Sequence, residues 1–220
     1  MKKGIVWSYT KGEFVIFDHY YFSTLYNYLK ENYNLEIPTR FNDIIKICKQ
    51  NTFNTIIFNY PEKSFTSNQI QQLLELYRNG KTIIFLTYYN NEDNSSQISN
   101  QVLSKVGIQI NHDEIIQEKN IHNNDKYLIL TGSIHKKIKY NVKNILMPCS
   151  ASVSILKKNS KYSYTELVKD GQNNKAIAIE VSSRGKIIAF GTCVFWDNFS
   201  ISMYDNFQFT KNLLQYCTEV

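Results

Sequence analysis

The sequence predicts an α/β fold with a doubly wound, mostly parallel sheet and an added antiparallel section. Short apolar runs alternate with amphipathic helical stretches along the 220 residues, and this alternation is typical of parallel strands joined by crossover helices. The run at residues 82–87 is apolar at its four central positions, as expected for a strand buried on both faces. We therefore expect helices to cover both faces of a central sheet.

Strands and helices alternate through the first half of the chain. Residues 4–7 form the first apolar run, and apolar residues recur every three or four positions over 20–33, which predicts the first helix. The helix at 66–78 has clear limits, because Thr66 or Ser67 can cap its start and Asn79-Gly80 can end it. The other elements expected here are strands at 35–37, 55–59 and 82–87 and a helix at 43–50.

The second half of the chain is more irregular. A helix over 97–106 ends at Gly107, and a last buried strand at 187–191 precedes a helix that starts at Asp205 or Asn206. Between them we expect an antiparallel excursion around residues 108–182, with short strands at 108–110, 127–131, 145–148, 152–156, 166–168 and 176–181. No repeat or linker interrupts the series, so we expect one domain over residues 1–220.

The composition excludes several classes of protein. With 43% hydrophobic and 20% charged residues, the chain is neither collagen-like nor disordered. Its apolar runs are too short to span a membrane, so we expect a soluble, cytoplasmic protein without a signal peptide. The cysteines, Cys48, Cys149, Cys193 and Cys217, stand far apart, which predicts free thiols rather than a zinc site or disulfides.

The motifs and the net charge bear on possible cofactors and partners. Neither a glycine-rich phosphate loop nor a metal-ligand spacing occurs, so we expect no cofactor and no metal. The net charge of +6 permits anionic partners. A basic run with an interleaved tyrosine is an alternative surface for nucleic acid, although a solvated loop explains it more simply. Its lysines are Lys136, Lys137, Lys139 and Lys143.

Polar and aromatic residues follow the predicted parallel strands. Ligands of open α/β sheets bind beyond the carboxyl ends of the strands, where carboxylates and amides can bond hydroxyls and aromatic rings can stack on a sugar. Alternatively, Asp18, Asp197 and Asp205 cap helices while Trp196 and Tyr60 cover the end of the sheet. The candidate ligand-binding residues are Glu13, His19, Tyr60, Tyr89, Asn90, Glu92, Asp93, Thr192, Trp196 and Asp197.

Three segments carry a resemblance to a known family. They are residues 7–22, which begin Trp-Ser-Tyr-Thr-Lys-Gly-Glu, residues 57–85, and residues 184–207, which contain Gly-Lys-Ile-Ile-Ala-Phe-Gly-Thr. In this order and spacing they resemble the GIFT-like domain of gliding-motility ABC-transporter accessory proteins and of an intraflagellar transport subunit. This domain is a branch of the class I glutamine amidotransferase-like superfamily, so the resemblance implies a flavodoxin-like sheet.

The resemblance also bears on catalysis. Active relatives carry a nucleophilic cysteine or serine on a sharp turn after a central strand, but here Tyr88-Tyr89-Asn90 follows that strand. A cryptic hydrolase or transferase would need Cys149 or Cys193 in its place.

The sequence therefore predicts a non-catalytic binding or scaffolding module. We expect it to recognise a partner protein or a small polar ligand, including a saccharide, at the strand ends, and association with a membrane complex is compatible with this role. A nucleic-acid-binding accessory protein and a cryptic enzyme remain the alternatives.

Overall fold

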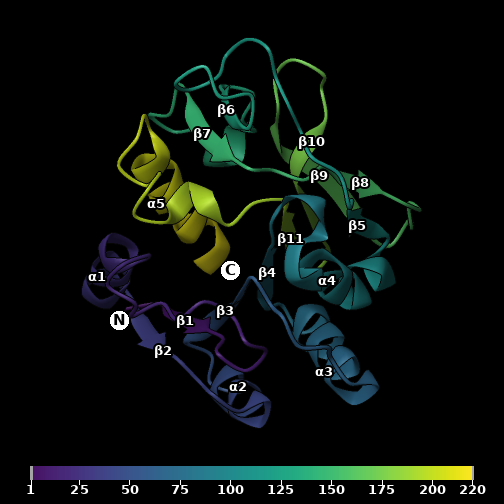
Figure 1. The fold of residues 1–220 in the computed structure, drawn as a ribbon. Helices are drawn as coiled ribbons and strands as arrows, with labels where there is room; N and C mark the ends of the chain where they lie inside the picture. Colours follow the sequence, from purple (N-terminus) through teal and green to yellow (C-terminus); the bar gives the residue numbers. More distant parts are fainter. Residues whose placement is uncertain (1, 220) are drawn as a thin grey trace.

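The computed structural model describes residues 2–219, and a seven-stranded sheet forms its centre (Figure 1). The strand order is β2-β1-β3-β4-β11-β10-β9. The first five strands of this order are parallel, and β10 and β9 extend the sheet antiparallel at one edge. The predicted doubly wound, mostly parallel sheet is confirmed. The strands are β1 (Gly4–Trp7), β2 (Asn34–Glu36), β3 (Phe53–Asn59), β4 (Thr82–Leu86), β9 (Ser163–Lys169), β10 (Ala176–Ser182) and β11 (Lys186–Phe190).

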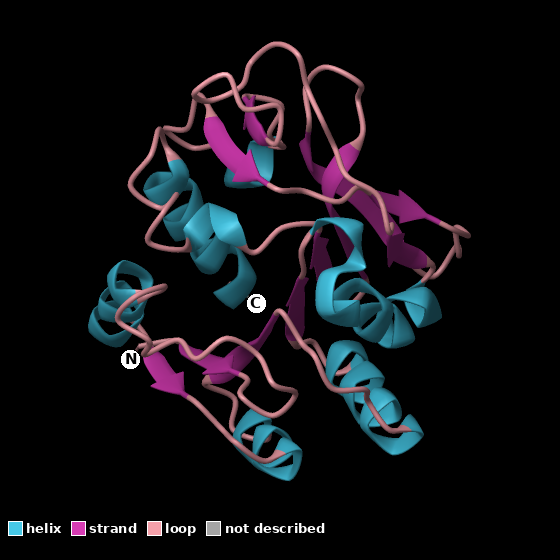
Figure 2. Ribbon diagram, in the orientation of Figure 1, coloured by secondary structure: helices cyan, strands magenta, loops and turns pink. Residues whose placement is uncertain are grey.

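Helices cover both faces of this sheet (Figure 2). Side chains alternate between the two faces along each strand, so Ile57 packs with α1 and α5 while Ile56 and Phe58 pack with α2, α3 and α4. Burial on both faces explains why the central strands are apolar throughout. The helices are α1 (Ser23–Asn32), α2 (Phe41–Cys48), α3 (Ser67–Arg78), α4 (Ser95–Leu103) and α5 (Asn206–Thr218), with short 3-10 segments η1 (Tyr89–Asn94), η2 (Ser104–Val106), η3 (Lys136–Ile138) and η4 (Val194–Trp196).

The added antiparallel section is also confirmed, and its strands divide among three sheets. β5 (Ile108–Ile110) pairs with β8 (Val153–Ile155), and β6 (Leu128–Thr131) pairs with β7 (Ile145–Pro148). The remaining two strands, β9 and β10, belong to the central sheet. The small β6–β7 sheet lies beside α5 (Figure 1).

Asn206 attaches the β6–β7 sheet to the rest of the fold. Its side chain is fully buried at the start of α5. The Oδ1 atom accepts a hydrogen bond from the backbone N–H of Leu146, and Nδ2 donates to the carbonyls of Leu146 and Phe195. One amide therefore joins β7, η4 and α5.

Several local expectations need correction. The first helix begins at Ser23 rather than near residue 20, because Asp18 accepts a bond from the Tyr20 N–H in a turn. Asp205 stands before α5 without capping it, since its carboxylate accepts from the backbone N–H groups of residues 143 and 144 instead. Asp197 closes a turn and caps no helix. In contrast, Thr66 and Gln69 form a capping box at α3.

The state of the cysteines and the lengths of the helices agree with the expectations from the sequence. Cys48, Cys149, Cys193 and Cys217 are all free, and only Cys149 is partly exposed. Within residues 2–219, every helix is too short or too polar to cross a membrane.

Candidate functional site

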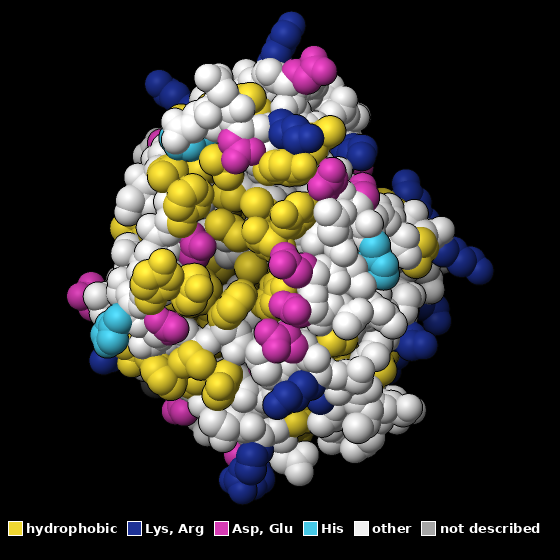
Figure 3. All heavy atoms as spheres, in the orientation of Figure 1, with side chains coloured by type: hydrophobic (Ala, Val, Ile, Leu, Met, Phe, Trp, Pro, Cys, Tyr) yellow, Lys and Arg dark blue, Asp and Glu magenta, His cyan; other side chains and the backbone are white. Residues whose placement is uncertain are grey.

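A hollow of about 350 Å³ lies at the carboxyl ends of the parallel strands. β1 lies between β2 and β3 in the sheet, so the chain changes direction there, and this is where open α/β sheets bind their ligands. Figure 3 shows hydrophobic side chains gathered in the middle of one face, with acidic side chains beside them. We call this hollow the strand-end pocket. Its lining residues are Phe14, Tyr21, Phe22, Tyr60, Tyr88, Glu92, Asp93, Cys193, Val194 and Asp197.

Tyr60 organises the aromatic wall of the pocket. It follows β3 directly with a φ of 67°, a left-handed conformation that is rare for a bulky side chain. Its ring stacks on Phe14 with centroids 4.9 Å apart, and its hydroxyl donates to Asp93 Oδ2 at 2.9 Å. Burial and the neighbouring Asp93 raise the pKa of this phenol. The strained residue therefore joins the loop after β1 to the loop after β4, and strain of this kind concentrates at functional sites.

The segment η1 brings two carboxylates to the pocket. Asn90, Asn91, Asp93 and Asn94 all have positive φ between 51° and 61°, which asparagine and aspartate tolerate better than other side chains. The backbone N–H of Asn90 donates to Asp113, and the side chain of Asn91 accepts from the start of α4. This irregular turn places Glu92 and Asp93 in the pocket lining.

Asp197 supplies the third carboxylate from the loop between β11 and α5. Its Oδ1 accepts from the N–H groups of Phe199 and Ser200, and no hydrogen bond to Oδ2 is formed by the described residues. Burial raises the pKa of this carboxyl from 3.8 to about 6, although the two backbone bonds act in the opposite direction. An ionised Asp197 is therefore costly unless a cation compensates it.

Four of the predicted site residues line the strand-end pocket, namely Tyr60, Glu92, Asp93 and Asp197. His19 is exposed outside the lining, and its carbonyl accepts from the side chain of Asn198. Tyr89 and Asn90 belong to η1 but do not line the hollow, because the turn directs only its later residues there.

The other three predicted residues are buried and serve the fold. Glu13 accepts from the Ser8 hydroxyl and from the Lys11 backbone N–H, which closes the loop after β1. Burial raises the pKa of Glu13 despite these bonds. The hydroxyl of Thr192 donates to the Pro148 carbonyl. The ring of Trp196 is 0% exposed, so it covers the sheet end and has no face free to stack on a sugar.

Sequence reasoning missed the apolar part of the lining, because it selected hydrogen-bonding groups at the strand ends. The missed residues are Phe14, Tyr21, Phe22 and Val194, whereas Tyr88 was named as the residue that follows the central strand and Cys193 as a possible nucleophile. The aromatic residues among them lie in the same loops as the predicted ones. The density of aromatic residues between positions 14 and 22 was the available signal.

The two candidate replacement nucleophiles lack activation. Burial raises the pKa of Cys193 and of Cys149, whereas a nucleophilic thiol needs a lowered pKa. Cys149 has a φ of 47° after β7 and lies beside the hydroxyl of Tyr88. A strained backbone after a strand is typical of a catalytic nucleophile, but the burial of Cys149 favours the neutral thiol.

The basic run is partly occupied by internal contacts. Lys137 Nζ lies 3.0 Å from the fully buried carboxylate of Glu180, and Lys139 Nζ donates to the Gly132 carbonyl. All four lysines are exposed, but within the described residues Nζ of Lys136 and of Lys143 makes no ion pair or hydrogen bond. Two of the four ammonium groups are therefore already engaged within the fold.

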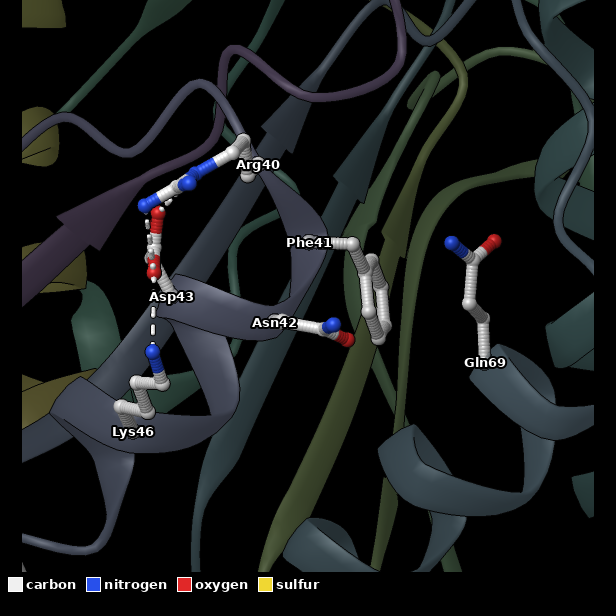
Figure 4. Close-up of a pocket in the computed structure, with 6 residues that line it drawn as sticks. All are labelled: Arg40, Phe41, Asn42, Asp43, Lys46 and Gln69. Carbon is white, nitrogen blue, oxygen red and sulfur yellow. Dashed lines mark hydrogen bonds and ion pairs between the residues drawn. The ribbon is translucent and has the colours of Figure 1, made fainter.

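A second hollow, of about 300 Å³, lies between the starts of α2 and α3 (Figure 4). Asp43 bridges Arg40 and Lys46 along α2 in exposed ion pairs, which contribute little to stability. Gln69 points toward this hollow from α3, but its carbonyl already accepts from Thr66 and from Lys11. The charged groups of this hollow pair with one another and Gln69 Oε1 is already bonded, so the strand-end pocket is the better candidate site.

Comparisons with known proteins agree with this fold. No family model matches the chain. A protein of Aquifex aeolicus (strain VF5), described only as uncharacterized, is 34% identical over 228 residues, which is 98% of this chain and 94% of that protein. Among solved structures, the mmIFT52 N-terminal domain superposes with a TM-score of 0.80 at 17% identity, covering 98% of both chains.

A cytoplasmic protein of Salmonella typhimurium is a more distant structural neighbour. It matches with a TM-score of 0.54 at 11% identity, covering 85% of this chain and 82% of that protein. The chain therefore belongs to the family of the Aquifex aeolicus protein and has the fold of a GIFT-like domain.

Proposed function

We propose that the chain is a non-catalytic binding module that holds a segment of a partner protein in the strand-end pocket. The observation that carries this proposal is the composition of the lining, where five aromatic rings and three carboxylates converge from the loops after β1, β3, β4 and β11. Aromatic side chains offer a large contact area at a low cost in conformational entropy. A concave site of this kind suits an inserted side chain.

Exposed aromatic residues extend the binding surface beyond the pocket. Tyr20 is 78% exposed and Phe199 is 51% exposed. Asn198 holds their two loops together, because its Nδ2 donates to the carbonyl of Tyr20 and to the hydroxyl of Ser23. Exposed aromatic surface beside a pocket is typical of protein interaction sites. The site is therefore suited to a ligand longer than a single small molecule.

The electrostatics and the fold support binding over catalysis. Both thiols near the pocket have a raised pKa, which disfavours the thiolate. The likeness of fold to the mmIFT52 N-terminal domain supports a scaffold module of the intraflagellar-transport type.

The proposal is tested by selecting binders from a random peptide library displayed on phage. Val194→Trp fills the pocket from η4, and Tyr21→Ser removes an exposed part of its wall. Leu156→Trp is the matched control, since Leu156 is exposed outside the pocket lining. Circular dichroism establishes that each variant is folded.

We expect the wild type and Leu156→Trp to retain the selected peptides, and the two pocket variants to lose at least tenfold in affinity, which corresponds to about 1.4 kcal/mol. Equal affinity in all four proteins, or a failure to enrich any peptide, contradicts the proposal.

A further inference from the structure

We infer that the strand-end pocket receives a cationic side chain, lysine or arginine, of the partner protein. This inference rests on the proposed function and specifies the chemistry of the inserted group. It follows from the kinds of atoms in the lining, from their lack of internal counter-ions, and from the surface around the pocket mouth.

The lining combines π faces with negative charge. Phe14 stacks on Tyr60, and Tyr88 meets Tyr60 edge to face with centroids 6.4 Å apart. A ring face attracts a cation through its quadrupole, and such attraction is stronger where water is excluded. Glu92, Asp93 and Asp197 add three carboxylates to the same hollow, and among the described residues no lysine, arginine or histidine lines it.

The three carboxylates also lack cationic partners within the described fold. The ion pairs found over residues 2–219 involve Asp43, Asp113, Glu166 and Glu180, and none of the pocket carboxylates. The chain as a whole carries a net charge of +6, so an unpaired acidic group is a local feature of this site. A cation brought by a ligand would supply the missing partner.

Other ligand classes fit the lining less well. Ionised carboxylates can accept hydrogen bonds from the hydroxyls of a sugar but cannot donate to them. The Tyr60 hydroxyl already donates to Asp93, so the hydroxyl donors that remain in the lining are Tyr21 and Tyr88. Glu92, Asp93 and Asp197 line the same hollow but do not form a group that could hold one metal ion, and the described residues contain no other such group of three or more histidine, cysteine, aspartate or glutamate side chains. Aromatic faces with carboxylates match an organic cation.

The surface around the mouth indicates that a protein carries this cation. Tyr20 and Phe199 stand exposed on two loops joined by Asn198, and Tyr21 continues this surface into the pocket. A free small cation would leave this aromatic surface uncovered. A peptide segment with a basic residue and apolar neighbours would fill the pocket and cover the aromatic surface around its mouth.

The inference is tested on the peptides selected above by replacing each lysine with norleucine, which keeps the four side-chain carbons and removes the ammonium group. A peptide anchored by arginine has the arginine replaced by norleucine. We expect the pocket-dependent peptides to lose about tenfold in affinity. If the norleucine peptides bind the wild type as tightly as their parents do, and bind the Val194→Trp variant more weakly than the wild type, the inference of a bound cation is wrong while the proposed function stands. Peptides indifferent to Val194→Trp count against the proposed function itself.

The protein side of the contact is tested with the triple variant Glu92→Gln, Asp93→Asn and Asp197→Asn. Each amide keeps the shape of the carboxylate, and the carbonyl oxygen can still accept the existing hydrogen bonds. The control is Glu31→Gln, Glu36→Gln and Glu118→Gln, three exposed sites outside the pocket, which raises the net charge by the same amount. We expect only the first variant to lose the preference for lysine or arginine over norleucine. If both variants lose this preference equally, the inference is contradicted, because the preference then arises from the net charge of the protein and not from contacts in the pocket.

A free cation is distinguished by titrating the wild type with choline and with its neutral isostere 3,3-dimethylbutan-1-ol, followed by nuclear magnetic resonance. We expect choline to shift pocket resonances weakly and to compete with the lysine peptides, and the alcohol to do neither. Choline that binds more tightly than every peptide overturns the assignment to a partner side chain.

Discussion

The indole Nε1 of Trp196 donates a hydrogen bond to Oδ1 of Asn59 over 3.2 Å, across 137 positions of the chain. Both side chains are fully buried. Asn59 ends β3 and precedes Tyr60, while Trp196 ends η4 and precedes Asp197. This single bond therefore fixes the separation of two walls of the strand-end pocket.

Trp196→Phe removes this donor and leaves the Asn59 amide without its hydrogen bond. We expect a loss of about 1–3 kcal/mol in the free energy of unfolding, because a buried polar group left unpaired costs its desolvation. Urea denaturation measures the loss. The double variant with Asn59→Leu removes both polar partners and should cost less than the sum of the two single variants. Strictly additive costs would show that the two side chains do not interact.

Asp197→Asn should change how stability depends on pH. The pKa of Asp197 is raised to about 6 from 3.8, so between these values the folded state binds more protons than the unfolded state. The free energy of unfolding of the wild type therefore falls as pH rises through this interval.

The variant keeps the bonds from Phe199 and Ser200 through its Oδ1 atom and removes the charge. We expect it to be more stable than the wild type by about 1–3 kcal/mol at pH 7 and to show a flatter pH profile. Urea midpoints at several pH values between 4 and 8 measure both effects. Parallel profiles for the two proteins would be inconsistent with a raised Asp197 pKa.

Lys137→Met should destabilise the fold, because the Glu180 carboxylate is fully buried and Lys137 is its ion-pair partner. We expect a loss of about 1–3 kcal/mol on thermal or urea unfolding. Lys136→Met is the matched control, since the neighbouring Lys136 is exposed and forms no ion pair within the described residues, and it should change little. Adding Glu180→Gln to Lys137→Met should recover part of the loss. If both lysine variants unfold alike, Lys137 belongs to a solvated basic surface, as the nucleic-acid alternative requires.

Asn206→Ala should loosen the β6–β7 sheet, because this side chain makes hydrogen bonds to the backbone of Leu146 and Phe195. We expect a loss of about 3 kcal/mol in unfolding free energy and faster hydrogen exchange at the Leu146 amide. Asn32→Ala, at an exposed position of α1, is the control. Unchanged protection at Leu146 would mean that the strand pairing alone holds β7 in place.

Local patterns were enough to predict the central sheet and its helices. The apolar runs of β3, β4 and β11 are buried on both faces, and a strand in that position leaves a clear signal in the sequence. The capping residue of α3 was likewise predicted to be Thr66 or Ser67. A capping box joins residues only three positions apart, so it is visible in the sequence. The start of α1 shifted because Asp18 closes a local turn with the Tyr20 N–H, and Asn198 from a distant loop also binds the carbonyls of residues 19 and 20.

The pocket lining depends on such distant contacts. Phe14 and Tyr60 stack only after β1 and β3 become neighbours, and neither residue signals this by itself. Glu13 follows a strand in the sequence as a ligand-binding residue would, yet its carboxylate turns inward to Ser8. Whether a polar side chain at a strand end faces a ligand or the protein is decided by partners far along the chain. The sequence therefore predicts which end of the sheet carries the candidate site, but only four of the ten residues it selects line the strand-end pocket.

The proposed site is tested by mapping a selected peptide onto the protein through the amide resonances of the ¹⁵N-labelled wild type. We expect the largest shifts at Tyr60, Glu92, Asp93 and Asp197, which line the strand-end pocket, and none along Lys136 to Lys143. Shifts that cluster on the basic run and leave the pocket residues unchanged would contradict the account.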